Sequence, residues 1–273
     1  IRDKEVLFVR LAHQLNADCL SNAQNLKVIC SPTTGLNHID LAYCEKYDIR
    51  IISLKGETQF LKTIRATPEH TLGLIIALRR HYQRAFLSID NPIWDREPYK
   101  GYEIYNSKIG IIGLGRVGHI VADYLLQMGA NVGFYDCNDS VRHEKALQFE
   151  NSSKLIQWAD TIILCASYNA EQGIIIDSKL IDLMKDKYFI NTARAELTDE
   201  SHLSIMALEG FFKGLAVDVV LDEQNSRENL NKLLEAVKKH NVIVTPHIGG
   251  ATFSSMARTE EFIVSKWINS IEI

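Results

Sequence analysis

Four ionisable side chains follow predicted strands in the second half of the chain: Arg194, then the acids Asp218 and Glu223, then His247. In an open α/β sheet, ligands bind beyond the carboxyl ends of the strands, so we expect these groups to gather at one edge. A histidine can give a proton to a carbonyl oxygen near neutral pH, and a paired carboxylate would hold its ring. A guanidinium can grip a substrate carboxylate through two parallel hydrogen bonds. The set indicates a redox step in which a hydride adds to a carbonyl carbon.

Each of these residues also has an ordinary structural explanation. Arg194 could be a surface cation at a strand end, and Glu223 could belong to a solvated acidic pair with Asp222. His247, which follows Pro246 in a glycine-flanked turn, could be a loop histidine whose hydrogen bonds are all satisfied. A second pattern, upstream of all of them, favours the chemical interpretation.

That second pattern is a dinucleotide motif between Ser107 and Asp136. Gly113, Gly115 and Gly118 have the spacing G-x-G-x-x-G between an apolar strand and an amphipathic helix. The first glycine allows a tight turn, the second lets backbone N–H groups approach a pyrophosphate, and the third lets the helix pack closely on the strand. Asp136 ends the next strand, where its carboxylate can bind the adenosine ribose and repel a 2′-phosphate, so NAD is favoured over NADP. A strand–helix–strand unit without a nucleotide is the alternative.

Alternating strands and helices must position these residues, and this alternation predicts parallel sheets covered by helices. We expect a Rossmann-type doubly wound domain over residues 67–251, opened by a long helix from Thr67 to Ile89. Residues 1–66, completed by residues 252–273, should form a smaller flavodoxin-like α/β substrate domain. In the smaller domain we expect a helix from Leu11 to Gln24.

Composition excludes several classes of protein. The 273 residues are 46% hydrophobic with a net charge of −4, and no basic block suggests nucleic acid. The longest apolar run, residues 72–78, is too short to cross a membrane. The five cysteines are scattered without a disulfide framework or a metal-ligand spacing. We therefore expect a cytoplasmic enzyme without a metal site.

Six segments together resemble the D-isomer-specific 2-hydroxyacid dehydrogenase family, with phosphoglycerate dehydrogenase-like members closest. The segments, in chain order, are SPTTGLNHID from Ser31, Glu69-His70-Thr71, GLGRVG from Gly113, NTARAELTDE from Asn191, AVDVVLDE from Ala216 and TPHIGGAT from Thr245. The resemblance covers nearly the whole chain and implies an NAD-dependent enzyme that interconverts a D-2-hydroxy acid and its 2-keto acid. It also implies a homodimer built through the nucleotide domain.

The resemblance assigns roles to individual residues. It implies that Arg194 binds the substrate carboxylate and carbonyl, that His247 is the acid/base and that Glu223 tunes it. Backbone groups of Pro32, Thr33 and Thr34 should hold the substrate carboxylate. The residues expected to contact NAD, including those derived above, are Gly113, Gly115, Arg116, Val117, Gly118, Asp136, Ser167, Thr192, Ala193, Asp218, Gly249 and Gly250.

Arg10 lies where phosphoglycerate-type members contact a substrate phosphate, which favours a phosphorylated substrate such as 3-phosphoglycerate. A plain surface arginine at a strand end explains it equally well.

The sequence departs from the family pattern in four places. Ala195, Gln224 and Ser167 replace a common Gly, Pro and Pro, which affects the fine geometry beside the cofactor. A β-α unit that usually precedes residues 5–9 is absent, and the chain does not begin with Met, so we expect upstream residues and an incomplete N-terminal part of the substrate domain.

Two alternatives to a 2-hydroxyacid dehydrogenase remain open. The first is an NAD(H)-sensing, corepressor-like scaffold without turnover. The second, a formate dehydrogenase, is disfavoured because those enzymes pair Gln, not Glu, with the histidine.

Overall fold

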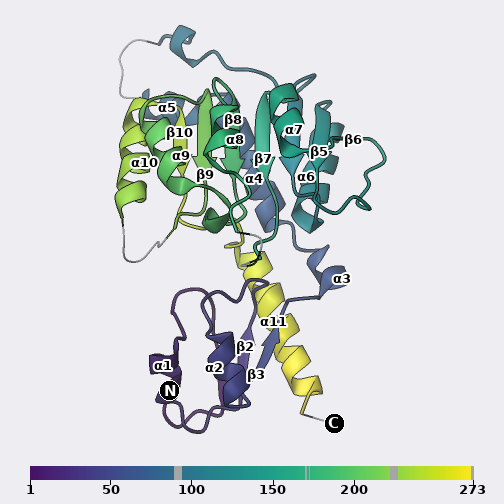
Figure 1. Ribbon diagram of the computed structural model, residues 1–273, viewed down its shortest axis with the longest axis vertical. Coiled ribbons are helices and arrows are strands. Elements are labelled where there is room, and N and C mark those ends of the chain that lie inside the picture. The colour runs from purple at the N-terminus through teal and green to yellow at the C-terminus, as the bar shows by residue number, and fades with distance from the viewer. Residues whose placement is uncertain (89–93, 170, 172, 222–226, 272–273) are drawn as a thin grey trace. The chain divides into compact units, whose positions relative to one another are not determined.

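The computed structural model describes residues 1–88, 94–169, 171, 173–221 and 227–271. The chain divides into two compact units, one formed by Ile1–Ile64 with Gly250–Ile273 and the other by Arg65–Gly249. Figure 1 shows a separate parallel sheet in each unit.

The larger unit is built on a parallel sheet with the strand order β10-β9-β8-β7-β4-β5-β6 (Figure 1). The chain starts in the middle with β4, moves to β5 and β6 on one side, and then returns to β7 to build the other side. The strands are β4 (Lys108–Ile112), β5 (Asn131–Tyr135), β6 (Leu147–Gln148), β7 (Thr161–Leu164), β8 (Tyr188–Asn191), β9 (Gly214–Val217) and β10 (Val242–Val244). The predicted doubly wound parallel sheet is confirmed.

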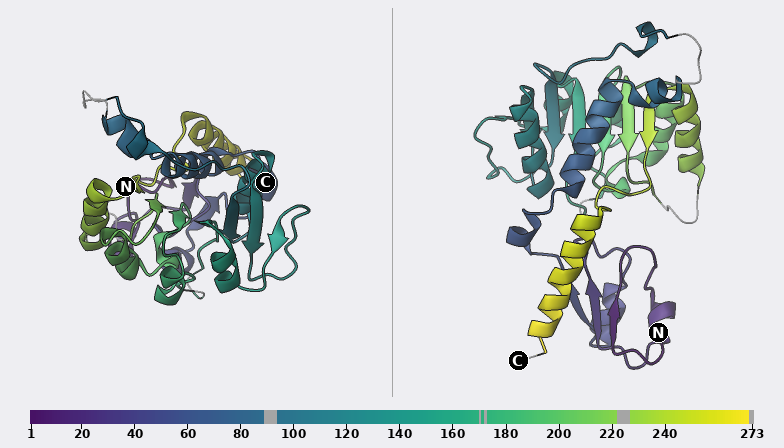
Figure 2. Two further views of the ribbon diagram at one scale, coloured as in Figure 1. Left: turned by 90° about the horizontal axis from the view of Figure 1, so that it is seen from above. Right: turned by 180° about the vertical axis from the view of Figure 1, so that it is seen from behind.

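Helices cover both faces of this sheet, as the opposite views in Figures 1 and 2 show. One apolar layer lies under α4 and α6 and includes Ile75, Leu78 and Val121, which are fully buried. The other lies under the helices of the opposite face and includes Leu155 and Leu233. The helices are α4 (Ala66–Arg79), α5 (Tyr82–Leu87), α6 (Arg116–Gln127), α7 (Ser152–Trp158), α8 (Ser178–Asp182), α9 (Glu200–Leu208) and α10 (Glu228–Lys239). Burial on both faces explains why the strands are continuous apolar runs.

The smaller unit has a three-stranded parallel sheet in the order β1-β2-β3. Neighbouring residues of β2 face opposite layers, since Ile29 packs in the cluster with Leu20 and Cys44 whereas Cys30 packs with Ile263. The C-terminal helix therefore completes this unit. The elements are β1 (Val6–Phe8), α1 (Ala17–Ser21), β2 (Val28–Ser31), α2 (Leu41–Lys46), β3 (Arg50–Ser53), α3 (Thr58–Leu61) and α11 (Phe253–Asn269).

Two predicted helices differ in extent from the structure. The helix expected from Leu11 begins only at Ala17, because Asn16 caps it and Leu15 pairs with Ile39 in an isolated bridge. The long helix expected from Thr67 begins at Ala66 and breaks after Arg79, where His81 has a left-handed φ of 53°. Its expected end at Ile89 lies outside the described residues. Periodicity alone does not reveal such a break, because α5 resumes helical spacing at once.

Candidate active site

The carboxyl ends of six strands lie at one level of the larger unit's sheet. The pairing register aligns the last residues of neighbouring strands across the sheet. These are Val244, Val217, Asn191, Leu164, Ile112 and Tyr135. In the larger unit, the predicted site residues that the structure describes follow these six positions. One edge of one sheet thus carries the glycine-rich turn, Asp136, Arg194, Asp218 and His247.

The glycine-rich turn has a different geometry at each glycine. Gly113 has a φ of +90°, and a Cβ there would lie 2.5 Å from the backbone of Ala166. A Cβ on Gly118 would lie 2.2 Å from the carbonyl oxygen of Gly113, so this glycine lets α6 approach its own turn. A Cβ on Gly115 would meet no atom within 4 Å. Gly115 is the N-cap of α6, so its surroundings leave room for a ligand at the helix N-terminus.

Asp136 connects this turn to the end of β5. Its Oδ2 atom accepts a hydrogen bond from the backbone N–H of Leu114 (2.8 Å), and its Oδ1 atom accepts one from Asn138 (2.9 Å). The side chain is partly exposed. The carboxylate therefore holds the turn while remaining accessible to a ribose.

Arg116 and Val117 open α6 directly after Gly115, and both are partly buried. Burial and the charge of Arg65 lower the pKa of the Arg116 guanidinium. A cation in such a place gains from a nearby anion such as a pyrophosphate. Ser167 is exposed three residues after β7.

The turn that carries Arg194 is tied together by Asn191, the last residue of β8. The Asn191 side chain accepts from the backbone N–H of Ala193 (3.0 Å) and donates to the carbonyl oxygen of Arg194 (3.1 Å). The Arg194 guanidinium is partly exposed and donates to the carbonyl oxygen of Ala193 (2.7 Å). Thr192 is buried. Asn191 is a positioning residue that the sequence analysis did not identify.

Asp218 organises the turn that carries His247. Its carboxylate accepts from the Thr245 hydroxyl (2.6 Å) and from the backbone N–H groups of Ile248 (2.9 Å) and Gly249 (2.8 Å). A Cβ on Gly249 would lie 2.9 Å from Asp218 Oδ2. Burial would raise the pKa of Asp218, but hydrogen bonds from His70, Thr245, Ile248 and Gly249 outweigh it and hold the pKa below its ordinary value. The predicted contact of Asp218 with NAD stays a prediction.

Two further polar residues reach this edge from α4. His70 Nε2 lies 3.2 Å from Asp218 Oδ1 and 3.2 Å from Thr245 Oγ1, and the Thr71 hydroxyl lies 2.7 Å from that of Thr192. In the sequence, His70 and Thr71 stood out only as members of the segment Glu69-His70-Thr71, without a role of their own. The available signal was their polarity on a helix that buries Leu74, Ile75 and Leu78.

Glu223, the third predicted catalytic residue, lies outside the described residues. The backbone just before it is held by Glu200, whose Oε2 accepts from the N–H of Leu221 (2.7 Å).

The predicted substrate loop lies in the smaller unit, after β2. Pro32 is buried and Thr34 exposed, while the Thr33 hydroxyl donates to the carbonyl oxygen of Gly35 (2.7 Å) and lies 2.8 Å from Ser31 Oγ. Gly250, also in this unit, is exposed, and its carbonyl oxygen accepts from the Ser255 hydroxyl (2.8 Å).

The Arg10 side chain is hydrogen-bonded to residues of α11. Its guanidinium donates to Glu260 Oε1 (2.7 Å), to the carbonyl oxygen of Met256 (3.1 Å) and to Thr259 Oγ1 (3.1 Å). These contacts favour the interpretation of Arg10 as a structural tie within the smaller unit.

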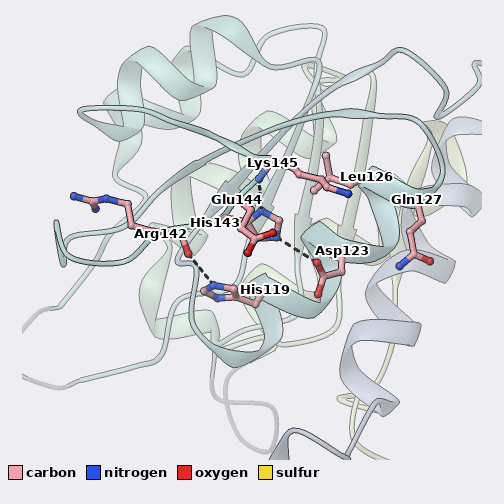
Figure 3. A pocket seen from close by; sticks show the side chains of 8 residues that line it. All are labelled: His119, Asp123, Leu126, Gln127, Arg142, His143, Glu144 and Lys145. Atoms are coloured by element: carbon pink, nitrogen blue, oxygen red, sulfur yellow. Dashed lines mark hydrogen bonds and ion pairs between the residues drawn. The ribbon is translucent and has the colours of Figure 1, made fainter.

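A hollow of about 470 Å³ lies beside α6, between this helix and residues 142–145 (Figure 3). His119 and Asp123 lie one helical turn apart on α6, and His143 Nε2 is 3.3 Å from Asp123 Oδ1. Backbone N–H groups of Lys145 and Ala146 donate to His143 Nδ1, so its proton is on Nε2, which faces Asp123. Both ring nitrogens of His143 thus have hydrogen-bond partners.

Across the described chain, no group of three His, Cys, Asp or Glu side chains is arranged to hold a metal ion.

The strand-end edge fits a bound dinucleotide. An open cradle at Gly115, a helix N-terminus behind it and a partly exposed carboxylate at Asp136 match a pyrophosphate and a ribose in order. The fold and the site together define a nucleotide-binding oxidoreductase of the Rossmann type.

The family profile for the D-isomer specific 2-hydroxyacid dehydrogenase NAD binding domain matches residues 72–249. The chain therefore belongs to the D-isomer specific 2-hydroxyacid dehydrogenase family of NAD-dependent enzymes, and its cofactor is NAD. The predicted family and cofactor are confirmed.

Three similar proteins illustrate the range of the family. The chain is 29% identical over 274 residues to hydroxypyruvate reductase of Thermotoga maritima, spanning 100% of this chain and 87% of that protein. It is 30% identical to D-3-phosphoglycerate dehydrogenase of Methanocaldococcus jannaschii, spanning 92% of this chain but 47% of that protein. The structure of D-lactate dehydrogenase from Aquifex aeolicus, complexed with NAD and lactic acid, is 30% identical with a TM-score of 0.83, covering 98% and 84% of the two chains.

Along the described chain, no helix is both long enough and apolar enough to cross a membrane.

Proposed function

We propose that the protein interconverts a D-2-hydroxy acid and its 2-keto acid, using His247 as the acid/base and Arg194 as the anchor of the substrate carboxylate. The observation that carries the proposal is the strand register. Arg194 and His247 follow strand ends that are level with the end of β4, which opens the glycine-rich turn. A cation, a histidine and a nucleotide turn at one sheet edge suit carbonyl reduction.

Each side chain has a definite task in this reaction. NADH, when bound, supplies the hydride that adds to the carbonyl carbon. The imidazole of His247 gives a proton to the carbonyl oxygen in reduction and takes it back in oxidation. The Arg194 guanidinium binds the substrate carboxylate and polarises the carbonyl. Glu223 pairs with His247 in this proposal.

The substrate class follows from the groups that would recognise it. A short 2-keto acid needs only Arg194 and the backbone of Pro32–Thr34. A phosphorylated substrate such as 3-phosphoglycerate would also need a cation such as Arg10, whose guanidinium is engaged by α11. We therefore favour an unphosphorylated acid of the kind that a hydroxypyruvate reductase or D-lactate dehydrogenase is named for. A phosphorylated acid is the second candidate.

The test is NADH oxidation with a panel of 2-keto acids, including phosphorylated ones, and a chirality assay on the product. We expect turnover, a D-hydroxy acid, and a loss of roughly 10²-fold or more in kcat for His247→Ala. Arg10→Met should leave the KM of the best substrate unchanged; an increase would favour a phosphorylated acid. Tight NADH binding without turnover of any acid would instead favour the NAD(H)-sensing scaffold.

We also infer a homodimer formed through the larger unit. Large apolar side chains are exposed near the end of α5 and beyond it, with Phe86 at 68%, Leu87 at 74% and Trp94 at 100% exposure. Adjacent exposed apolar side chains such as Phe86 and Leu87 at the end of one helix suggest a protein–protein contact. Light scattering after gel filtration should give the mass of a dimer, and Phe86→Ser with Trp94→Ser should shift it toward the monomer.

A cytoplasmic location is the remaining inference. All five cysteines lie in the described chain and are free thiols, as expected for a reducing compartment.

A further inference from the structure

The start of α4 contacts three of the strand-end loops that form the site. His70 reaches Asp218 after β9 and Thr245 after β10, while Thr71 reaches Thr192 after β8. Adjacent residues on a helix point in directions about 100° apart. One turn of helix can therefore serve loops on neighbouring strands.

The hydrogen-bond directions around His70 follow from its partners. The Thr245 hydroxyl gives its hydrogen to Asp218 Oδ1 (2.6 Å), which leaves the threonine oxygen as an acceptor. The ionised carboxylate is an acceptor only. His70 Nε2 therefore carries a proton and shares it between Asp218 Oδ1 and Thr245 Oγ1, both at 3.2 Å. Asp218 binds Thr245 before His247 and Ile248 and Gly249 after it, so His70 contacts the groups that hold the His247 turn.

The same reasoning fixes the pair around Thr71. Its hydroxyl donates to the carbonyl oxygen of Thr67 (2.8 Å), so the Thr192 hydroxyl donates to Thr71 (2.7 Å). Thr71 is fully buried and Thr192 is 7% exposed, so water cannot readily replace this bond. Thr192 begins the turn that Asn191 closes onto Arg194.

We infer that His70 and Thr71 are positioning residues of the active site, His70 for the turn that carries His247 and Thr71 for the turn that carries Arg194. The inference rests on the proposed function, since it assigns distinct tasks to these two turns. Groups that orient active-site loops matter because a misplacement of about 1 Å can cost roughly 10²-fold in rate.

Two pairs of variants separate positioning from general stability. His70→Leu removes the donor, whereas His70→Gln keeps an N–H at a similar reach. Thr71→Val removes the hydroxyl, whereas Thr71→Ser keeps it. The matched control is His202→Leu, which removes a histidine that contacts Asp182 (2.9 Å) on the opposite helical layer.

We expect the two positions to change different kinetic constants. His70→Leu should lower kcat about tenfold or more, with NADH affinity within about twofold of wild type. In His70→Gln, kcat should return to most of the wild-type value. Thr71→Val should raise the KM of the 2-keto acid about tenfold with a smaller change in kcat, and Thr71→Ser should restore it. If all parameters fall together with the melting temperature, or if His70→Leu behaves like His202→Leu, the inference is wrong.

A second measurement needs no turnover. Hydrogen exchange followed by mass spectrometry should show faster exchange of residues 247–249 in His70→Leu and of residues 193–198 in Thr71→Val, each reversed by the conservative variant. Unchanged exchange would overturn the inference even in an active enzyme. Absence of turnover in the wild type would overturn only the proposed function. If His70→Leu does not fold, His70→Asn, whose shorter amide cannot reach both acceptors, carries the same comparison.

Discussion

The backbone N–H of His247 donates a hydrogen bond to the backbone carbonyl oxygen of Asp218 (2.8 Å), while the Asp218 carboxylate binds the residues on either side of the histidine. His247 has a φ of 52°, in the left-handed region, which costs a residue other than glycine about 1–2 kcal/mol. Such a conformation persists where the surroundings over-determine it, and here one aspartate supplies both main-chain and side-chain contacts. The turn is thus set before any substrate arrives.

Asp218→Asn tests this arrangement. The amide keeps one acceptor but loses the second oxygen and the charge, so the N–H of Gly249 loses its partner. We expect the free energy of unfolding to fall by about 1–3 kcal/mol, as for other buried donors left unpaired. Urea unfolding measures it. Asp182→Asn, at an exposed carboxylate, is the control and should change little.

Acid should remove the same stabilisation from the wild type. The pKa of Asp218 in the folded chain lies below its ordinary value of 3.8, because hydrogen bonds outweigh burial. The stabilisation is therefore complete above about pH 4 and is lost as the pH falls through the lower folded pKa. The stability difference between wild type and Asp218→Asn should narrow below about pH 4. A difference that stays constant into that range would contradict the shifted pKa.

Gly115 and Gly118 provide a matched pair for the nucleotide turn. Gly118→Ala would place its Cβ 2.2 Å from the carbonyl oxygen of Gly113, so we expect both a lower melting temperature and weak NADH binding. Gly115→Ala meets no protein atom within 4 Å. It should weaken NADH binding, by roughly tenfold, and leave the melting temperature within a few degrees. Fluorescence titration and thermal unfolding separate the two. Equal decreases in the melting temperature of Gly115→Ala and Gly118→Ala would refute this difference between the two glycines.

Asp136 should set the preference between the two nicotinamide cofactors. Asp136→Ala removes the negative charge that would face a 2′-phosphate and the acceptor for the N–H of Leu114. We expect NADH affinity to fall about tenfold or more and the NADH-to-NADPH ratio to fall with it. Asp139→Ala, three residues on, is the control. A ratio unchanged in Asp136→Ala would mean that another group reads the ribose.

How far the sequence predicts the site depends on the kind of signal. The glycine spacing and the strand ends are local patterns, so the sheet edge that carries Arg194 and His247 could be located in advance. The hydrogen bonds of Asp218 to Thr245 and Gly249 could not, because these partners come from a different loop.

Some elements of the fold escaped prediction for similar reasons. The break between α4 and α5 depends on the left-handed conformation of His81. The sequence has no glycine or proline at this position that would predict such a conformation. Helix α7 and strand β6 are short, and their sequences carry weak periodicity. His70 and Thr71 were visible as residues, but their purpose depends on three loops that only the sheet topology brings together.

His38, in the smaller unit, is buried beside the predicted substrate loop. His38 is 3% exposed, and its Nε2 lies 3.4 Å from Ser31 Oγ, which in turn contacts the Thr33 hydroxyl. Since Thr33 donates to Gly35, Ser31 donates to Thr33 and His38 donates to Ser31. The neutral histidine thus orients the predicted substrate loop.

Protonation of His38 would add a hydrogen to Nδ1, a buried atom without a partner among the described residues. Burial accordingly lowers the pKa of His38 below its ordinary 6.5. Because the unfolded chain then binds the proton more readily, the stability of the wild type should decline as the pH falls from about 6.5 toward the folded pKa, with a slope of at most about 1.4 kcal/mol per pH unit. His38→Gln keeps a donor for Ser31 but does not titrate, so it should lack this part of the slope, whereas His13→Gln, at an exposed position, should retain it. Urea unfolding between about pH 7.5 and 5.5 compares the three proteins, and parallel slopes would show that His38 does not titrate as its burial requires.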